Sequence, residues 1–215
     1  MPVYDYIRDP QEIYRKSFAT VRSEADFSAI DEAMATVAER LIHACGMPDI
    51  LGDLAWTQDA AAAGREALRA GAPVLADCRM VVEGVIRARL PGDNVVLCTL
   101  NDPRTAPLSA ELGTTRSAAA VEFWRDHLDG AVVAVGNAPT ALFHLLEMLA
   151  ETDARPAVIL GFPVGFVGAA ESKDALIEAD LGVPYITLRG RRGGSAMAAA
   201  AVNALAGLAK GESAQ

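Results

Sequence analysis

The sequence predicts an α/β protein with a three-layer α/β/α arrangement, a mostly parallel five-stranded sheet and an N-terminal helical segment. Before about residue 70, apolar residues recur at helical spacing, and from Pro73 onward short apolar runs alternate with helical stretches. These runs are continuous rather than alternating in polarity, which is typical of parallel strands buried on both faces. We therefore expect a single domain over 1–215, with helices at about 10–70 and the sheet portion at about 71–210.

The amino-acid composition limits the classes of protein to which the chain can belong. The chain has 215 residues, of which 52% are hydrophobic and 22% charged, so it can bury a sizeable core. Its formal charge of −9 argues against binding of nucleic acid through a basic surface, although a local basic pocket for a small anion remains possible. The N-terminus does not resemble a signal peptide, and the uncharged run Gly193–Ala209 is too short and too rich in small residues for a membrane span.

The three cysteines, Cys45, Cys78 and Cys98, are an odd number in a long chain and match no compact metal motif. This pattern indicates a reducing compartment. We therefore expect a cytoplasmic protein that has no membrane partner and no metal site.

Three helices are expected in the N-terminal segment. Asp9 is a typical N-cap before Pro10 at the first helical position, which predicts a helix to about Glu24. A second helix is expected from Ser28 to Cys45, because its apolar residues form one narrow stripe. A third is expected from Thr57 to Arg69, capped by Thr57 and stopped by Gly71.

The remaining chain predicts five strands, each followed by a helix. The expected strands are Pro73–Ala76, Asn94–Leu97, Ala131–Val135, Ala157–Leu160 and Tyr185–Leu188. The expected helices are Arg79–Arg87, Arg116–Leu128, Thr140–Glu151, Glu171–Ala179 and Gly194–Leu208.

His43 is the first candidate functional residue. It lies in the last turn of the second helix, well off the apolar stripe and on the polar side that carries Glu39. Gly46 follows as a natural helix terminator, so the imidazole should lie beside the last carbonyls, where the helix dipole favours its protonated form. Glu39, one turn earlier, is a candidate to orient it. The plainer interpretation is a solvated histidine that stabilises the end of a helix.

The loops after the strands are the second candidate, because ligands of such sheets bind outside the carboxyl ends of the strands. The Gly136 and Gly161 loops can be simple tight turns, and neither fits a dinucleotide or phosphate fingerprint. Arg189–Ser195 is more informative, because it combines three arginines, three glycines and the start of the last helix, as a carboxylate or phosphate site would. Its alternative is a solvated basic loop.

Other polar residues carry weaker signals. Arg116 and Lys173 each open a helix after a strand-end loop and can add to the basic site. His127 is expected to be solvated, and His144 to be a satisfied, partly buried histidine. No catalytic triad order or paired histidine ligands stand out.

Several stretches together resemble the precorrin-8X methylmutase (precorrin isomerase) family of the cobalamin pathway. They cover almost the whole chain in order and are Arg15–Phe18, Leu41–Asp49, Gly71–Asp77, Met80–Gly84, Cys98–Leu100, Gly136–Phe143, Gly161–Lys173 and Arg189–Ser195. The resemblance implies an isomerase that moves a methyl group from C11 to C12 of precorrin-8X, or of its cobalt form, to give hydrogenobyrinic or cobyrinic acid. Such a shift is similar to a sigmatropic rearrangement and implies no cofactor.

The resemblance also implies roles for individual residues. The family's key histidine matches His43, which would donate a proton or hydrogen bond to a macrocycle nitrogen. The substrate, a polycarboxylated tetrapyrrole, would be bound by Tyr14, Arg15, Ser17, Thr99, Arg116, Gly136, Asn137, Phe166, Lys173, Arg189, Arg191 and Arg192. A homodimer with sites near the subunit boundary is implied as well.

Two alternatives stay open at this point. A corrinoid carrier would need the same basic pocket and no catalytic histidine, and a nucleotide-dependent α/β enzyme is disfavoured by the missing phosphate fingerprints. The sequence does not choose between metal-free and cobalt-containing substrate.

Overall fold

One six-stranded sheet forms the centre of the computed structural model, which describes residues 3–211. The strands in spatial order are β1 (Leu54–Trp56), β6 (Tyr185–Leu188), β5 (Val158–Gly161), β4 (Val132–Val135), β2 (Val74–Ala76) and β3 (Val96–Leu97). Strands β2 to β6 run parallel, as predicted, whereas β1 pairs antiparallel with β6 through Leu54 and Leu188.

The predicted strand count of five is therefore one short. All five predicted strands are present, and the missed one is β1. It has only three residues, and just the first of them is fully buried, so it shows neither a continuous apolar run nor a clear alternation.

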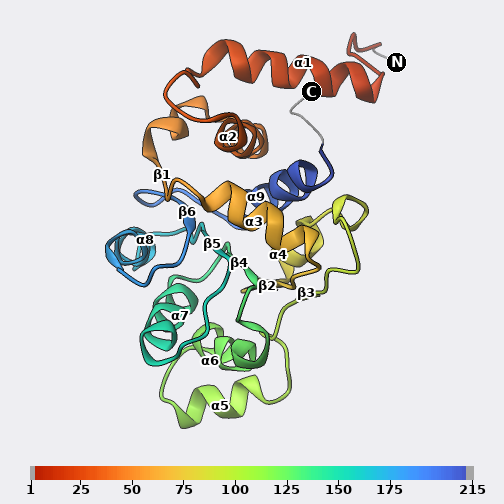
Figure 1. The fold of residues 1–215 in the computed structure, drawn as a ribbon. Coiled ribbons are helices and arrows are strands. Elements are labelled where there is room, and N and C mark those ends of the chain that lie inside the picture. The colour runs from red at the N-terminus through yellow and green to blue at the C-terminus, as the bar shows by residue number, and fades with distance from the viewer. Residues whose placement is uncertain (1–2, 212–215) are drawn as a thin grey trace.

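Helices cover both faces of the sheet (Figure 1). One face carries α3 (Ala60–Arg69), α4 (Arg79–Gly84) and α9 (Ser195–Ala209). The other carries α6 (Arg116–Val121), the 3-10 helix Glu122–His127, α7 (Pro139–Glu151) and α8 (Ala169–Glu178), with α5 (Thr105–Glu111) outside them. The predicted three-layer α/β/α arrangement is confirmed.

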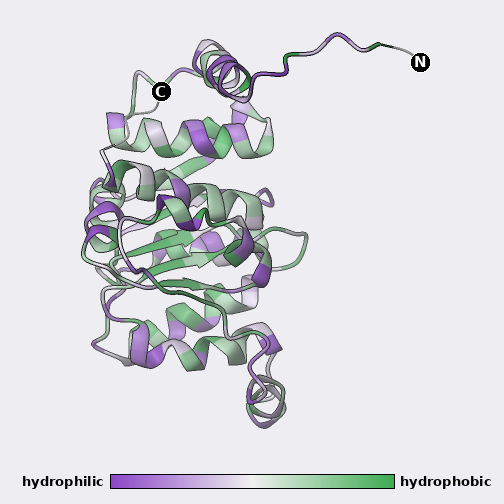
Figure 2. Cartoon of the chain, turned by 90° about the vertical axis from the view of Figure 1, so that its right-hand side faces the viewer, coloured by the Kyte–Doolittle hydropathy of each residue, from purple (hydrophilic) through white to green (hydrophobic). Residues whose placement is uncertain are grey.

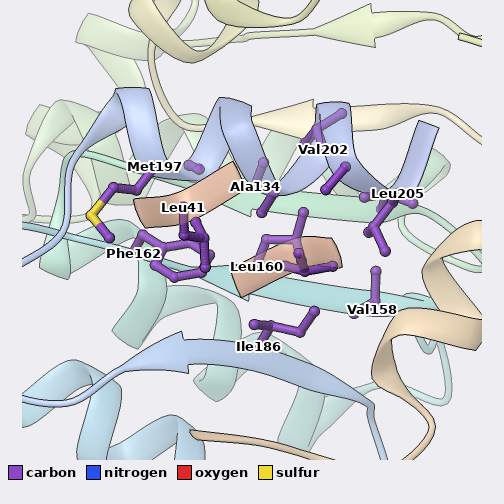
Figure 3. Close-up of a cluster of buried hydrophobic side chains, with 14 of the residues drawn as sticks. Leu41, Ala134, Val158, Leu160, Phe162, Ile186, Met197, Val202 and Leu205 are labelled. Atoms are coloured by element: carbon purple, nitrogen blue, oxygen red, sulfur yellow. The ribbon is translucent and has the colours of Figure 1, made fainter. Parts of the chain in front are cut away.

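The N-terminal helices α1 (Pro10–Glu24) and α2 (Glu32–Cys45) add a further layer over α9 (Figure 1). Helix α9 is rich in alanine and apolar around its circumference, which is expected for a helix with neighbours on all sides. Figure 3 shows Leu205 of α9 beside Val158 of β5, with Leu41 of α2 reaching the same cluster near Met197. This packing fixes the last turn of α2 against the start of α9.

Local hydrogen bonds explain where two helix starts differ from the prediction. Helix α2 begins at Glu32 rather than Ser28, because the Asp31 carboxylate accepts from the Met34 amide at 2.9 Å and caps the helix there. Helix α3 begins at Ala60, because the predicted cap Thr57 instead accepts the Tyr185 amide at 3.2 Å with its hydroxyl.

Other boundaries differ as well. The predicted helix Arg79–Arg87 ends at Gly84, and the predicted helix Arg116–Leu128 is α6 followed by a separate 3-10 helix. Helix α5 was not predicted. Hydropathy in Figure 2 follows the layers, with apolar residues concentrated on the strands and on the helix faces that cover them. Within residues 3–211, every helix is too short or too polar to span a bilayer.

Candidate active site

His43 lies in the last turn of α2, where α1 crosses it. Its Nδ1 atom is 2.8 Å from the Ser17 hydroxyl, and its ring stacks on Phe18 with centroids 4.9 Å apart. The Tyr14 ring lies 5.8 Å away on the same side. Gly46 ends the helix in the left-handed conformation, with φ 69°, and donates its amide to the Ile42 carbonyl. The imidazole is thus held by a hydroxyl and two aromatic rings from α1.

The environment of His43 lowers its pKa. Burial is the larger cause, and the positive charge of Arg40, one turn earlier, is the second. This direction is opposite to the expected effect of the helix end, because burial and the charge of Arg40 both favour the neutral imidazole. The Arg40 guanidinium also lies 5.9 Å from the Tyr14 ring centre and 5.5 Å from that of Phe18. An anionic ligand beside Arg40 would raise the pKa of His43 again.

Glu39 does not orient His43, contrary to the prediction. Its carboxylate is buried and accepts two hydrogen bonds from Arg22, at 2.7 Å and 3.2 Å, on the α1 side. The pair ties α1 to α2 and sets the crossing that brings Ser17 to His43. The imidazole instead contacts the hydroxyl of Ser17, a residue that the family resemblance implied as a substrate ligand.

Two hollows meet at His43. One, of about 400 Å³, is lined by residues of α1 and the end of α2, including Lys16 and Ser17. The other, of about 380 Å³, lies between α2 and α9 and includes Arg40, Arg89 and Tyr14. Among residues 3–211, the lining of the second hollow contains two arginines and no carboxylate. This arrangement suits an anion that presents its ring system to the imidazole.

At the carboxyl ends of the strands, a side chain of the protein itself lies where a ligand crevice was expected. The chain leaves β2 and β4 toward opposite sides of the sheet, so a crevice is expected between their carboxyl ends. There the Asp77 carboxylate accepts the backbone amides of Gly136, Asn137 and Ala138 at 2.8, 2.9 and 2.8 Å. Burial raises the pKa of Asp77 in spite of these donors. The protein's own carboxylate occupies the place of an external phosphate, which argues against a nucleotide site.

Gly136 is required by close packing in this loop. A Cβ atom there would lie 2.8 Å from the Ser195 Cα atom and 2.8 Å from the Ala198 Cβ atom. The Ser195 hydroxyl also lies 3.2 Å from the Cys78 sulfur. The strand ends therefore pack directly against the first turn of α9, whose other side faces the His43 hollow.

Lys173 and Arg192 are both bonded to other parts of the protein, although Lys173 is buried and the Arg192 side chain is 34% exposed. Lys173 is fully buried on α8, and its Nζ atom donates to the Arg192 carbonyl at 2.5 Å. Burial lowers the pKa of Lys173 to about 8. The Arg192 guanidinium pairs with Asp49 at 2.6 Å and with Asp53. The prediction that Lys173 itself contacts the ligand is therefore not supported by this placement; its amine lies beneath the basic loop.

Arg191 points to a different surface. Its guanidinium lies 5.6 Å from the centre of the Phe166 ring, which is 85% exposed. The two loops are joined by backbone contact, because a Cβ atom on Gly193 would lie 2.5 Å from the carbonyl oxygens of Phe162 and Pro163. Together, Arg191 and Phe166 form an exposed cationic and aromatic surface, which we call the loop platform.

The other predicted site residues differ in exposure and in their bonding partners. Arg15 is exposed on α1 near Tyr14, and Arg189 is exposed beside Asp174 at 3.7 Å. The side chain of Asn137 is exposed at the strand ends. Thr99 is buried and donates its hydroxyl to the Ala120 carbonyl at 2.7 Å, so it serves the fold.

Arg116 donates to the Leu100 carbonyl and the Asn101 side chain at 3.1 and 3.3 Å. It and Thr99 line neither hollow at His43. His127 is exposed, and His144 is half-buried with its Nε2 atom 2.6 Å from Glu122, as the sequence indicated for both. Over residues 3–211, no group of histidine, cysteine or acidic side chains is arranged to hold a metal ion.

The sequence reasoning missed Arg40, Arg89 and Asp77. Arg40 was detectable, because it precedes His43 by three residues and so shares its helix face. Arg89 and Asp77 gave no local signal, since each acquires its partner surface only through packing of distant segments.

The chain is similar to known proteins over nearly its whole length. Residues 12–208 match the family model for precorrin-8X methylmutase. The chain is 62% identical to a precorrin-8X methylmutase of Pseudomonas aeruginosa, covering 94% of this chain and 97% of that protein. It is 58% identical to one from a Sinorhizobium species, covering 96% and 98%, and 36% identical to a cobalt-precorrin-8 methylmutase of Priestia megaterium, covering 93% and 88%.

A solved structure is similar as well. The precorrin-8X methylmutase of Thermus thermophilus superimposes with a TM-score of 0.85 at 40% identity, covering 94% of this chain and 98% of that one.

Proposed function

Because the chain belongs to the precorrin-8X methylmutase family, an isomerase family of cobalamin biosynthesis, we propose that it moves the methyl group from C11 to C12 of the precorrin-8X macrocycle. The product is then hydrogenobyrinic acid. The methyl group stays within one molecule, so the reaction needs a proton donor and a fixed substrate conformation rather than a nucleophile.

The observation that carries this proposal is the setting of His43. A histidine held by the Ser17 hydroxyl and the Phe18 ring stands between two hollows, one lined by Lys16 and Glu24 and the other by Arg40 and Arg89. Protonated His43 donates to a macrocycle nitrogen near the migrating methyl group and withdraws electron density from the ring. Such general acid assistance contributes roughly 10²–10⁴-fold to a rate.

Basic side chains around His43 bind the carboxylates of the substrate. Lys16 lines the hollow on one side of the imidazole and Arg40 the hollow on the other. Arg15 lines a neighbouring hollow together with Tyr14 and Arg89, whereas the loop platform of Arg191 and Phe166 lies outside the two hollows at His43. In this proposal the Phe166 ring covers a face of the macrocycle. Holding the ring in one orientation lowers the barrier further.

We propose the metal-free macrocycle as the substrate. Two relatives named precorrin-8X methylmutase are 62% and 58% identical to this chain. A relative named cobalt-precorrin-8 methylmutase, from Priestia megaterium, is 36% identical. Incubating the protein with each substrate form and recording the visible spectrum separates the two, because methyl migration changes the conjugation of the ring.

The assembly and location follow the family resemblance. We propose a homodimer of single-domain subunits in the cytoplasm. The segment 3–9 extends away from the body (Figure 2), with Tyr4 and Tyr6 exposed at 72% and 61%, which supports a contact with a second copy. The unpaired cysteines support a reducing compartment.

The test of the function uses His43→Ala and His43→Asn, with turnover of precorrin-8X and binding of hydrogenobyrinic acid measured for each. We expect turnover to fall at least a hundredfold while product binding changes little. Near wild-type turnover by His43→Ala would exclude the proton-donor role. Tight product binding by a wild-type protein that moves no methyl group would identify a carrier instead.

A further inference from the structure

The short segment that follows α4 places an arginine at the His43 hollow. The 3-10 helix Arg87–Arg89 carries two arginines, and only Arg89 is among the residues that line this hollow together with His43. Arg89 also lines a neighbouring hollow of about 500 Å³, together with Arg15 and Tyr14. It therefore lies where the two hollows meet, as does Tyr14, which also lines both.

The segment is held in place by side chains of α9 and its end. The Asn203 side chain accepts the Ile86 amide at 2.8 Å and donates to the Gly84 carbonyl at 2.9 Å. Lys210, which caps α9, donates to the Ala88 carbonyl at 2.6 Å. Gly84 permits this approach, because a Cβ atom there would lie 2.6 Å from the Ala199 Cβ atom.

Asn203 is the one polar side chain in the buried stretch of an otherwise alanine-rich helix. A buried amide costs free energy unless its hydrogen bonds are made, and here both of its groups are bonded to the 84–86 backbone. The backbone that leads up to Arg89 is thus tied, at Gly84, Ile86 and Ala88, to α9 and its end. A side chain carried on an ordered backbone loses less entropy when it binds a partner.

From this placement, and resting on the function proposed above, we infer that Arg89 binds a carboxylate substituent of the macrocycle beside His43 and so selects acid over neutral side chains. The guanidinium presents two parallel N–H groups to a carboxylate, whereas an amide or ester at the same place accepts only one such bond and carries no charge. Arg89 is a substrate-binding residue in this scheme, and Asn203 positions it.

The test compares Arg89→Gln with Arg87→Gln, which removes the same charge from the same 3-10 helix at an exposed position outside the hollow. The measurement is the Kd of hydrogenobyrinic acid and of its fully methyl-esterified derivative. We expect Arg89→Gln to weaken acid binding by on the order of tenfold to a hundredfold and Arg87→Gln by less than threefold. Ester binding should be unchanged by Arg89→Gln.

Arg89→Lys serves as a second variant that keeps the charge and most of the packing. It should retain part of the preference for the acid. The inference about Arg89 would be wrong if the wild type binds the acid and all three variants, Arg89→Gln, Arg89→Lys and Arg87→Gln, bind it with equal affinity. The proposed function would still stand in that case. A wild-type protein that neither binds nor converts the corrinoid would overturn the proposed function itself.

Discussion

Ser17 and His43 lie 26 residues apart in the sequence and are joined by a 2.8 Å contact between the serine Oγ and the imidazole Nδ1. The contact fixes the ring orientation, so that Nε2 is the nitrogen left to meet a ligand. It exists because the Arg22–Glu39 ion pair and the Phe18 stacking hold α1 across the end of α2.

Removal of this contact should slow the reaction more than it weakens binding. We expect Ser17→Ala to lower kcat by about fivefold to tenfold with little change in KM, because one hydrogen bond contributes about 1 kcal/mol. Ser17→Thr, which keeps the hydroxyl, is the control and should retain most of the rate. Equal kcat for wild type and Ser17→Ala would show that the hydroxyl does not orient the imidazole.

The lowered pKa of His43 predicts the pH dependence of the free enzyme. A proton donor must be protonated. We therefore expect kcat/KM to be at its maximum below the pKa of His43 and to fall as the pH rises through that pKa, which lies under 6.5. Arg40→Gln removes a positive charge beside the ring and should move this limb to higher pH. A kcat/KM profile that is identical in the two proteins would rule out His43 as the titrating donor.

Lys173 predicts a pH dependence of stability. Its pKa is lowered from 10.5 to about 8 in the folded protein, so between these values the unfolded chain holds a proton that the folded one has lost. The contribution of Lys173 to the free energy of unfolding therefore rises as the pH increases from 8 to 10.5. Urea unfolding at pH 7 and pH 9.5 should show this gain in the wild type and lose it in Lys173→Met.

Lys16→Met is the matched control for this measurement, since Lys16 is exposed and its replacement removes the same charge while leaving the buried Lys173 in place. The same pH response in wild type and Lys173→Met would contradict the prediction. Lys173→Met should also weaken corrinoid binding, because the Arg192 carbonyl loses its donor and the basic loop is released.

The arginines of the basic loop should separate by function. Arg191→Ala should weaken corrinoid binding by roughly tenfold, because its guanidinium lies on the loop platform beside the exposed Phe166. Arg192→Ala should mainly lower the melting temperature, because its guanidinium joins the loop to Asp49 and Asp53. Titration with hydrogenobyrinic acid measures binding, and thermal unfolding measures stability. If Arg192→Ala weakened binding and Arg191→Ala lowered the melting temperature, the result would show that the Arg192 ion pairs break on binding.

Some features of the fold can be predicted from sequence patterns and others cannot. The five parallel strands were predictable, because strands buried on both faces need continuous apolar runs. Strand β1 was not, since three residues at an antiparallel edge show no periodicity. Pattern alone likewise placed His43 off the apolar stripe of α2, on its exposed side.

Side-chain assignments in the site depended on contacts between distant segments. Arg191, Arg192 and Lys173 are all simply basic in the sequence, yet one is exposed on an aromatic ring, one is paired with two acids and one is buried. The pairing of Ser17 with His43 and of Asp77 with the 136–138 amides arises only when separate elements pack.

The Asp77 carboxylate accepts hydrogen bonds from three consecutive amides at the junction of β2 and β4. Asp77→Asn keeps the shape but replaces one acceptor oxygen by an NH₂ group that faces backbone donors. At least one buried amide is left without an acceptor, which costs about 1–3 kcal/mol. We expect the free energy of unfolding in urea at pH 7 to fall by this order, and amide exchange at 136–138 to accelerate.

Loosening of this loop also frees Asn137 at the strand ends, so corrinoid binding should weaken in Asp77→Asn beyond the loss of folded protein. Asp180→Asn, at an exposed position, is the control for loss of one carboxylate and should alter neither stability nor amide exchange. If Asp77→Asn unfolds at the wild-type urea concentration with unchanged exchange at 136–138, the carboxylate does not hold the loop. If the loop loosens as expected, the amide left without an acceptor should attract an external anion, and inorganic phosphate should stabilise the variant but not the wild type.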